Sequence, residues 1–192
     1  MKKSPASYGG DLLKTRRGRA HGRPLSTQNT MHLVLRSSLA NRQWSFRRRA
    51  NDRQVRAIIA RFAARYGVTI KRLTNAGNHL HLHLKLTKRQ TYKAFIKAVT
   101  GAIAMAITGA SRWKTLKQAI AETYFKGELR DLYRKGVLRF WDRRPFTRIV
   151  YGFQGLSSMR DYLNLNELEM TGYTRAQARA IIASSSTGPP RA

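Results

Sequence analysis

Hydrophobic residues recur along the chain with two different periods, and together these periods predict an α+β fold. Apolar and polar residues alternate where strands are expected, whereas apolar residues recur every three or four positions where helices are expected. The order of these elements predicts a split βαβ, a ferredoxin-like antiparallel sheet with helices on one face. The expected elements are a strand over 31–36, a helix over 53–66, strands over 68–73 and 79–86, a helix over 88–108, helical pieces over 116–124 and 127–133, a strand over 146–151, and helices over 157–168 and 174–183.

Turn and capping residues set the expected boundaries of these elements. Asp52 is expected to cap the first helix and Thr87 the second, because their side chains can accept hydrogen bonds from the first turn. Gly67 is expected to end the first helix. Residues 75–78, Asn-Ala-Gly-Asn, predict the turn of a hairpin between the second and third strands.

Composition divides the chain into three expected parts. Residues 1–29 form a basic arm that is interrupted by glycine and proline. Residues 30–170 form the folded domain, with an irregular helical insert at 109–139, and residues 171–192 form a last helix and a tail. The arm is either a solvated tail or a segment that lies along phosphates and becomes ordered on binding.

Charge indicates the class of partner. The 192 residues include 38 Lys and Arg but only 9 Asp and Glu, which gives a formal net charge of +29. This excess favours a polyanion, usually nucleic acid, over the small anions of a typical enzyme. A membrane partner is not expected, because the sequence has no apolar run of 18 residues and no lipidation or secretory signal. We therefore expect a cytoplasmic, nucleoid-associated protein.

Rare residue types narrow the chemistry further. The absence of cysteine excludes disulfides, thiolate metal sites and a cysteine nucleophile. Asp52 is the one acidic residue between positions 12 and 121, so a two-metal nuclease site would have to draw on the C-terminal part. Cleavage of nucleic acid would instead depend on histidine and a hydroxyl group.

Three of the five histidines lie on one predicted strand, in the segment His79-Leu80-His81-Leu82-His83. Because side chains alternate across a strand, the imidazoles share one face and the leucines share the other, which should face the core. Two or three imidazoles could then bind one divalent cation. The alternatives are an ordinary polar outer face, a surface cluster, and a structural zinc site whose fourth ligand is not evident.

The segment Gly77-Asn78-His79-Leu80-His81-Leu82 resembles the His-hydrophobic-His motif of HUH endonucleases. Its place after a hairpin turn and before a long helix resembles single-tyrosine transposases of the insertion-sequence-200 type, most closely the REP-associated tyrosine transposases. The segment 161–166, Asp-Tyr-Leu-Asn-Leu-Asn, looks like the late helix that carries their catalytic tyrosine. The segment 140–144, Phe-Trp-Asp-Arg-Arg, looks like the tryptophan-containing stretch before their last strand. The resemblance covers roughly residues 30–170.

The resemblance implies a role for each matching residue. His79 and His81 correspond to the pair that binds Mg²⁺ or Mn²⁺, Tyr162 to the nucleophile, and Asn166 to the third metal ligand. The product would be a 5′-phosphotyrosine linkage and a free 3′-hydroxyl that can later rejoin strands. His83 has no counterpart in the motif. The helix continues Asn166-Glu-Leu-Glu169, where relatives usually have Asn-Pro, and the insert at 109–139 also departs from the pattern.

Residue spacing is compatible with these roles. Tyr162 and Asn166 are four residues apart, so a helix places them on one face, one turn from each other. The alternative is that Tyr162 packs in the core and Asn166 only caps the helix. Tyr151 is a second candidate nucleophile, and Glu167 or Glu169 could replace Asn166 as the ligand. His32 is expected to help pair the first strand rather than to bind metal.

The implied partner is single-stranded or hairpin DNA, and a second copy of the chain, in a homodimer, is a further candidate. Basic residues are expected to contact phosphates, namely Arg16, Arg17, Arg19, Arg47, Arg48, Arg49, Arg143 and Arg144. Aromatic residues near them could stack on bases or pack in the core, namely Trp44, Phe46, Trp113, Trp141 and Phe146. The rival functions are a non-catalytic nucleic-acid-binding protein, on this fold or another, and a metal-dependent hydrolase of small phosphoesters.

Overall fold

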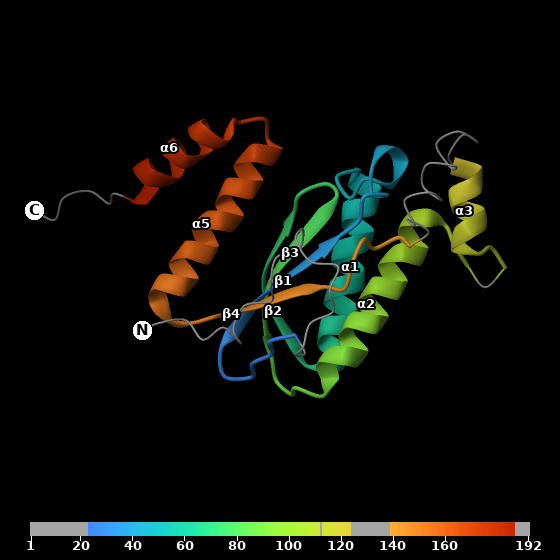
Figure 1. Cartoon of the computed structure of the whole chain (residues 1–192), viewed down its shortest axis with the longest axis horizontal. Helices are drawn as coiled ribbons and strands as arrows, with labels where there is room; N and C mark the ends of the chain where they lie inside the picture. Colours follow the sequence, from blue (N-terminus) through green and yellow to red (C-terminus); the bar gives the residue numbers. More distant parts are fainter. Residues whose placement is uncertain (1–22, 112, 124–138, 187–192) are drawn as a thin grey trace, which may run out of the picture. The chain divides into compact units, whose positions relative to one another are not determined.

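The computed structural model describes residues 23–111, 113–123 and 139–186, and Figure 1 shows its helices and strands. The chain divides into two compact units, one that ends at Ile149 and one that begins at Val150. Each unit is described by itself. No helix in the described ranges is long and apolar enough to cross a membrane.

The first unit is built on a four-stranded sheet. Its strands are β1 (Thr30–Arg36), β2 (Val68–Asn75), β3 (His79–Leu86) and β4 (Phe146–Val150), in the spatial order β2-β3-β1-β4. Strand β3 pairs antiparallel with both β1 and β2. It therefore lies between the two strands that flank the first helix, which is the split βαβ arrangement. The predicted α+β, ferredoxin-like class is confirmed.

Two helices cover one face of the sheet, α1 (Arg49–Tyr66) and α2 (Thr91–Thr108), which pack side by side (Figure 1). Each presents apolar residues at helical spacing to that face, such as Val55 and Ile59 from α1 and Phe95 and Val99 from α2. The leucines of β3 are fully buried against them. This apolar layer is the core of the first unit.

The predicted capping role of Asp52 is wrong, because α1 begins earlier, at Arg49. The chain enters α1 from a loop that is held to the hairpin turn, since the backbone N–H of Phe46 donates to the carbonyl of Gly77 at 2.9 Å. Asp52 consequently lies in the first turn of α1. Burial tends to raise its pKa, but hydrogen bonds from Arg56 and Asn75 outweigh that effect, and the pKa of Asp52 is lowered.

The predicted capping role of Thr87 is also wrong. Helix α2 begins at Thr91, and the residue before it is Gln90. The backbone N–H of Thr87 donates to the carbonyl of Gly67 at 3.1 Å, which ties the end of β3 to the end of α1. The chain therefore needs several further residues before it can turn into the helix. Gly67 ends α1 as expected and adopts a left-handed conformation with φ 63°.

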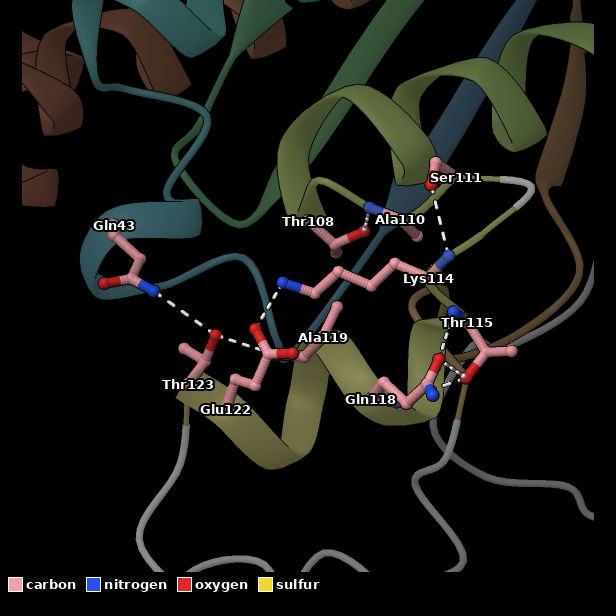
Figure 2. Close-up of polar contacts among 10 residues, drawn as sticks. All are labelled: Gln43, Thr108, Ala110, Ser111, Lys114, Thr115, Gln118, Ala119, Glu122 and Thr123. Carbon is pink, nitrogen blue, oxygen red and sulfur yellow. Dashed lines mark hydrogen bonds and ion pairs between the residues drawn. The ribbon is translucent and has the colours of Figure 1, made fainter.

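Part of the predicted helical insert is described, as helix α3 (Leu116–Thr123). Thr115 and Gln118 exchange hydrogen bonds between side chain and backbone at its start, which is a capping box. Figure 2 shows these contacts together with the Lys114–Glu122 ion pair and the hydrogen bond from Gln43 to Thr123. The second helical piece, predicted over 127–133, lies outside the described residues.

The second unit contains two helices, α5 (Gly152–Met170) and α6 (Arg175–Ser186). Helix α5 begins five residues before the predicted start at 157. It can follow β4 almost directly because Gly152 adopts φ 57°, a conformation that glycine tolerates without strain. Val150, Met159 and Leu163 form the buried cluster of this unit. Thr174 and Gln177 form a capping box at the start of α6.

Asn75 links the segments at one end of the sheet, and we predict that its loss lowers the stability of the fold. Its Nδ2 donates to the Phe46 carbonyl and to Asp52, both at 2.8 Å, and its Oδ1 accepts from the Gly77 N–H at 2.9 Å. Asn75→Ala would leave the Phe46 carbonyl, the Asp52 carboxylate and the Gly77 N–H without these hydrogen bonds. The free energy of unfolding, measured in urea, should therefore fall by about 1–3 kcal/mol.

The matched control for this prediction is Asn41→Ala, which removes an exposed side chain whose amide donates to the Ser38 carbonyl. This variant should change the free energy of unfolding by less than about 0.5 kcal/mol. Equal losses in the two variants would show that the Asn75 network contributes nothing specific.

Candidate functional site

The face of the sheet opposite the helical layer carries the histidines. Along the β1–β3 register, His32 lies opposite His83, Val34 opposite His81, and Arg36 opposite His79. The alternating residues on the other face are the buried leucines, so the predicted separation of imidazoles from leucines is confirmed. The sheet therefore places four histidines, three from β3 and one from β1, on one surface.

Two of the β3 imidazoles are in direct contact. The ring centroids of His79 and His81 are 4.7 Å apart with an interplanar angle of 75°. The His81 side chain is only 2% exposed, whereas His79 and His83 are partly exposed. The hairpin motif therefore brings His79 and His81 together, as the sequence predicted, at the end of β3 that follows the turn.

His32 is a member of this cluster that sequence reasoning did not assign to the site. Its Nε2 lies 3.0 Å from Nδ1 of His81, and the two rings stack with centroids 5.2 Å apart. The edge of Phe146 packs against the other side of His32, at 6.3 Å between centroids. The sequence held a signal for this contact. The split βαβ order places β1 beside β3, and the alternation of side chains along β1 puts His32 on the same face of the sheet as the β3 histidines.

Burial favours the neutral form of all four imidazoles. Burial, then the charge of Arg148 and the neighbouring His83, lowers the pKa of His32 to about 4. Burial, followed by the neighbouring His32 and His79, lowers the pKa of His81 to about 2. Burial is also the first cause of the lowered pKa of His79 and of His83. Neutral imidazole is the form that binds metal ions.

Hydrogen bonding determines which ring nitrogen could bind a cation. Nδ1 of His79 lies 2.6 Å from Oδ1 of Asn78, which can only accept, so His79 donates from Nδ1 and keeps a lone pair on Nε2. His81 also uses Nδ1 for its contact with His32. His79 thus offers Nε2, and His81 does so when its own Nδ1 carries the proton. Nitrogen ligands of this kind suit Mn²⁺ better than Mg²⁺.

Two further observations bear on a metal site. The Nε2 atom of His83 is buried and has no hydrogen-bond partner among the described residues. Within those same ranges, no group of three or more His, Asp or Glu side chains is arranged to hold a metal ion. The imidazole pair fits a divalent cation, and a third ligand would have to come from another residue type, such as an asparagine amide.

Helix α5 carries the candidate nucleophile and the candidate third ligand. Tyr162 is 40% exposed, so the alternative that it packs in the core is wrong. The Nδ2 atom of Asn166 donates to the carbonyl of Tyr162 at 2.7 Å, inside a helix that continues to Met170. Asn166 therefore does not cap the helix end. Its amide oxygen, the atom that a cation would bind, takes no part in this bond.

The other candidates on α5 differ in their surroundings. Tyr151 precedes the helix and is 44% exposed, close to the 40% of Tyr162. Glu169 forms an ion pair with Arg175 of α6 at 3.5 Å. Glu167 lines a groove of about 460 Å³ between α5 and α6. Since Glu169 already has a cationic partner, Asn166 suits the ligand role better than Glu169.

Basic segments lie beside the histidine end of the sheet. Arg47, Arg48 and Arg49 are exposed where the chain enters α1, and Arg143 and Arg144 are exposed before β4. The two segments are adjacent, because the ring of Phe46 stacks on that of Trp141 with centroids 5.8 Å apart. The first segment is also tied to the turn before His79 by the bond from Phe46 to Gly77.

The remaining residues predicted to contact DNA are three arginines of the basic arm and five aromatic residues. Arg16, Arg17 and Arg19 lie outside the described residues. Trp44, Phe46 and Phe146 are buried, so base stacking is excluded for them in this structure. Trp141 is half-buried and donates from Nε1 to the Thr100 carbonyl at 2.9 Å. Of the five predicted stacking residues, Trp113 alone is largely exposed, at 86%.

Comparisons with known proteins show the family and the fold of the chain. The family of IS200-like transposases matches residues 26–130, a range that includes His79 and His81 and ends before β4. The chain is similar to the structure of a REP-associated tyrosine transposase bound to a REP hairpin, with a TM-score of 0.53 and 11% identity over 82% of this chain and 77% of that one. This likeness shows a shared fold.

A second similar structure is that of a proposed transposase from Deinococcus radiodurans R1. Its TM-score is 0.43, with 18% identity over 80% of this chain and 98% of that chain. No curated protein sequence matches the chain significantly.

We predict that the neutral histidines make folding stability depend on pH. Below the ordinary histidine pKa of 6.5 the unfolded chain gains protons, whereas folded His32 stays neutral to about pH 4 and folded His81 to about pH 2. Their contribution is therefore complete above pH 6.5 and is lost as the pH falls. The free energy of unfolding should drop between pH 7 and pH 5, by at most about 1.4 kcal/mol per pH unit for each histidine.

The measurement is urea unfolding followed by circular dichroism at several pH values. His32→Gln, which cannot titrate, should make the profile less steep and leave the contribution of His81. Stability that does not change between pH 7 and pH 5 would show that these imidazoles are not kept neutral by the fold.

Proposed function

Because the chain belongs to the IS200-like transposase family, we propose that it cleaves and rejoins single-stranded or hairpin DNA through a covalent tyrosine–phosphate intermediate. The observation that carries this proposal is the pair of neutral, contacting imidazoles, His79 and His81, at the start of β3. The structural neighbour that is bound to a REP hairpin supports hairpin DNA as the substrate class.

His79 and His81 would hold a divalent cation, Mg²⁺ or Mn²⁺, through their Nε2 atoms, and the amide oxygen of Asn166 would be the third protein ligand. When bound, such a cation neutralises charge on the scissile phosphate and stabilises the leaving oxygen. The protein contributes the orientation of the ligands. The bond to Asn78 fixes the ring of His79, and the contact with His32 fixes the ring of His81.

Tyr162 would be the nucleophile. Its phenolic oxygen forms a bond to phosphorus, the bond from phosphorus to the 3′ oxygen breaks, and the phenol proton passes to a base while the 3′ oxygen takes up a proton. The products are a 5′-phosphotyrosine and a free 3′-hydroxyl. Attack by a 3′-hydroxyl on the same phosphorus reverses the step and joins strands, so no external energy source is required.

The exposed arginines beside the histidine end of the sheet would hold the DNA. Arg47, Arg48 and Arg49 from one segment and Arg143 and Arg144 from the adjacent one can neutralise successive phosphates. Arg16, Arg17 and Arg19 of the basic arm would contact further phosphates. Trp113, which is largely exposed, can stack on an unpaired base.

A non-catalytic DNA-binding protein on the same fold is the second candidate function. The observation that favours it is the pair of exposed arginine segments, 47–49 and 143–144, which can bind phosphates without any covalent step. This candidate keeps the proposed DNA contacts and removes the covalent step. Experiments on adduct formation and on binding therefore separate the two functions.

We predict that a labelled single-stranded hairpin incubated with the full chain and Mn²⁺ forms a covalent adduct that denaturing gels detect. Tyr162→Phe should abolish the adduct, because a phenylalanine ring has no nucleophilic oxygen. The matched control is Tyr151→Phe, which removes a hydroxyl from a tyrosine of similar exposure in the same unit and should leave adduct formation unchanged.

Two results would contradict this assignment. An adduct that persists in Tyr162→Phe and disappears in Tyr151→Phe would make Tyr151 the nucleophile. Salt-dependent binding of every hairpin without any adduct would favour the non-catalytic function.

We also predict that the arginines before β4 contact phosphates. A variant with Arg143→Ala and Arg144→Ala should bind single-stranded DNA more weakly, and the slope of log K against log salt should decrease in magnitude by about 1.4 for two lost contacts. The control is Lys93→Ala with Lys97→Ala, which removes the same charge from exposed positions on α2, over the opposite face of the sheet. Equal slopes for the two double variants would mean that binding follows net charge alone.

A further inference from the structure

The distance between His32 and His81 does not show which of the two rings donates the proton of their hydrogen bond. Nε2 of His32 and Nδ1 of His81 are 3.0 Å apart, and the rings are nearly parallel, with an interplanar angle of 19°. His32 is 8% exposed and His81 is 2% exposed. A hydrogen bond this well shielded from water holds both rings in fixed orientations.

Two buried imidazole nitrogens 3.0 Å apart form a hydrogen bond only when one carries a proton and the other a lone pair. Each neutral imidazole has one N–H group and one nitrogen lone pair. The hydrogen bond therefore needs one donor and one acceptor. If His81 donates from Nδ1, its Nε2 carries a lone pair. If His32 donates instead, Nε2 of His81 carries the proton and cannot bind a cation.

The neighbouring His79 indicates which arrangement the site requires. Its Nδ1 donates to the side-chain oxygen of Asn78 at 2.6 Å, so its Nε2 is the nitrogen with the lone pair. The rings of His79 and His81 are in contact on the same strand face. A cation shared by the two rings needs the same protonation pattern in both, with the proton on Nδ1.

We propose that His32 is a positioning residue, which accepts the Nδ1 proton of His81 and so keeps the lone pair of His81 on Nε2 for a divalent cation. This inference rests on the proposed role of His81 as a metal ligand. The surroundings of His32 suit a fixed acceptor. Its neighbours on β1, Met31 and Leu33, are fully buried in the core, and the edge of Phe146 packs against its ring.

Three variants of the full chain separate positioning from packing. His32→Leu removes the acceptor and keeps an apolar side chain in the site. His32→Gln restores an acceptor, because the glutamine Oε1 can reach the place of the histidine Nε2. Val34→Ala is the control, since Val34 is a buried residue directly opposite His81 that offers no hydrogen bond from its side chain.

Two measurements are made on each variant. The first is the tautomer of His81 in metal-free protein, from ¹⁵N chemical shifts of histidine-labelled samples, with the resonance assigned by its loss in His81→Gln. The second is the affinity for Mn²⁺ alone, from the signal of free Mn²⁺ in electron paramagnetic resonance. Neither measurement depends on DNA cleavage.

We expect wild-type His81 to carry its proton on Nδ1. His32→Leu should shift the tautomer of His81 and weaken Mn²⁺ binding about ten- to a hundredfold, whereas His32→Gln and Val34→Ala should stay within about threefold of wild type. A wild-type His81 that is protonated on Nε2 would overturn the inference, even if His32→Leu fails to fold. Unchanged tautomer and Mn²⁺ affinity in folded His32→Leu would also overturn it.

The failure of the proposed function has a different signature. If wild type binds no Mn²⁺ while His81 carries its proton on Nδ1, and that tautomer is lost in His32→Leu, the metal role is wrong but His32 still controls the proton position. If wild type binds Mn²⁺ with equal affinity in all variants, the metal role stands and the positioning role is wrong.

Discussion

The antiparallel pairing of β1 with β3 is the constraint on which the candidate site depends. Burial of Leu80, Leu82 and Leu84 against α1 and α2 fixes the register, because a slip of one residue would turn the leucines to the other face and the imidazoles into the core. The same register places His32 within hydrogen-bond distance of His81. Hydrophobic packing on one side of the sheet thus sets the geometry of the groups on the other side.

Sequence periodicity predicted the elements of the fold better than their ends. The strand over 79–86 agrees with β3, because strict alternation over eight residues admits one strand assignment. Asp52 and Thr87 were wrong as caps for one shared reason. Each lies where the chain is bound to a segment far away in sequence, the turn at 75–78 for the entry to α1 and Gly67 for the end of β3. Local capping preference cannot reveal such contacts.

The same limit applies to the candidate site. The spacing of His79 and His81 and of Tyr162 and Asn166 could be read locally, whereas the contact of His32 with His81 required the strand order. Trp44 and Phe46 lie among arginines in the sequence, which suggested contacts with bases. They are buried instead, and Phe46 packs on Phe140 and Trp141, more than ninety positions later in the sequence. An aromatic residue beside arginines has the same local sequence whether it meets a base or a distant aromatic ring.

The charge of the protein also constrains how the proposed metal and DNA sites would work together. Neutral imidazoles and an asparagine amide contribute no negative charge, and a chain with a net charge of +29 repels a divalent cation at long range. Under the proposed function, the phosphates of the bound strand supply the missing negative charge. Binding of DNA and of the cation would then favour each other, since any coupling free energy between two sites acts equally in both directions. The proposed ligands on the sheet include no carboxylate. Under the proposed function, the cation would therefore bind tightly only when the DNA substrate is also bound.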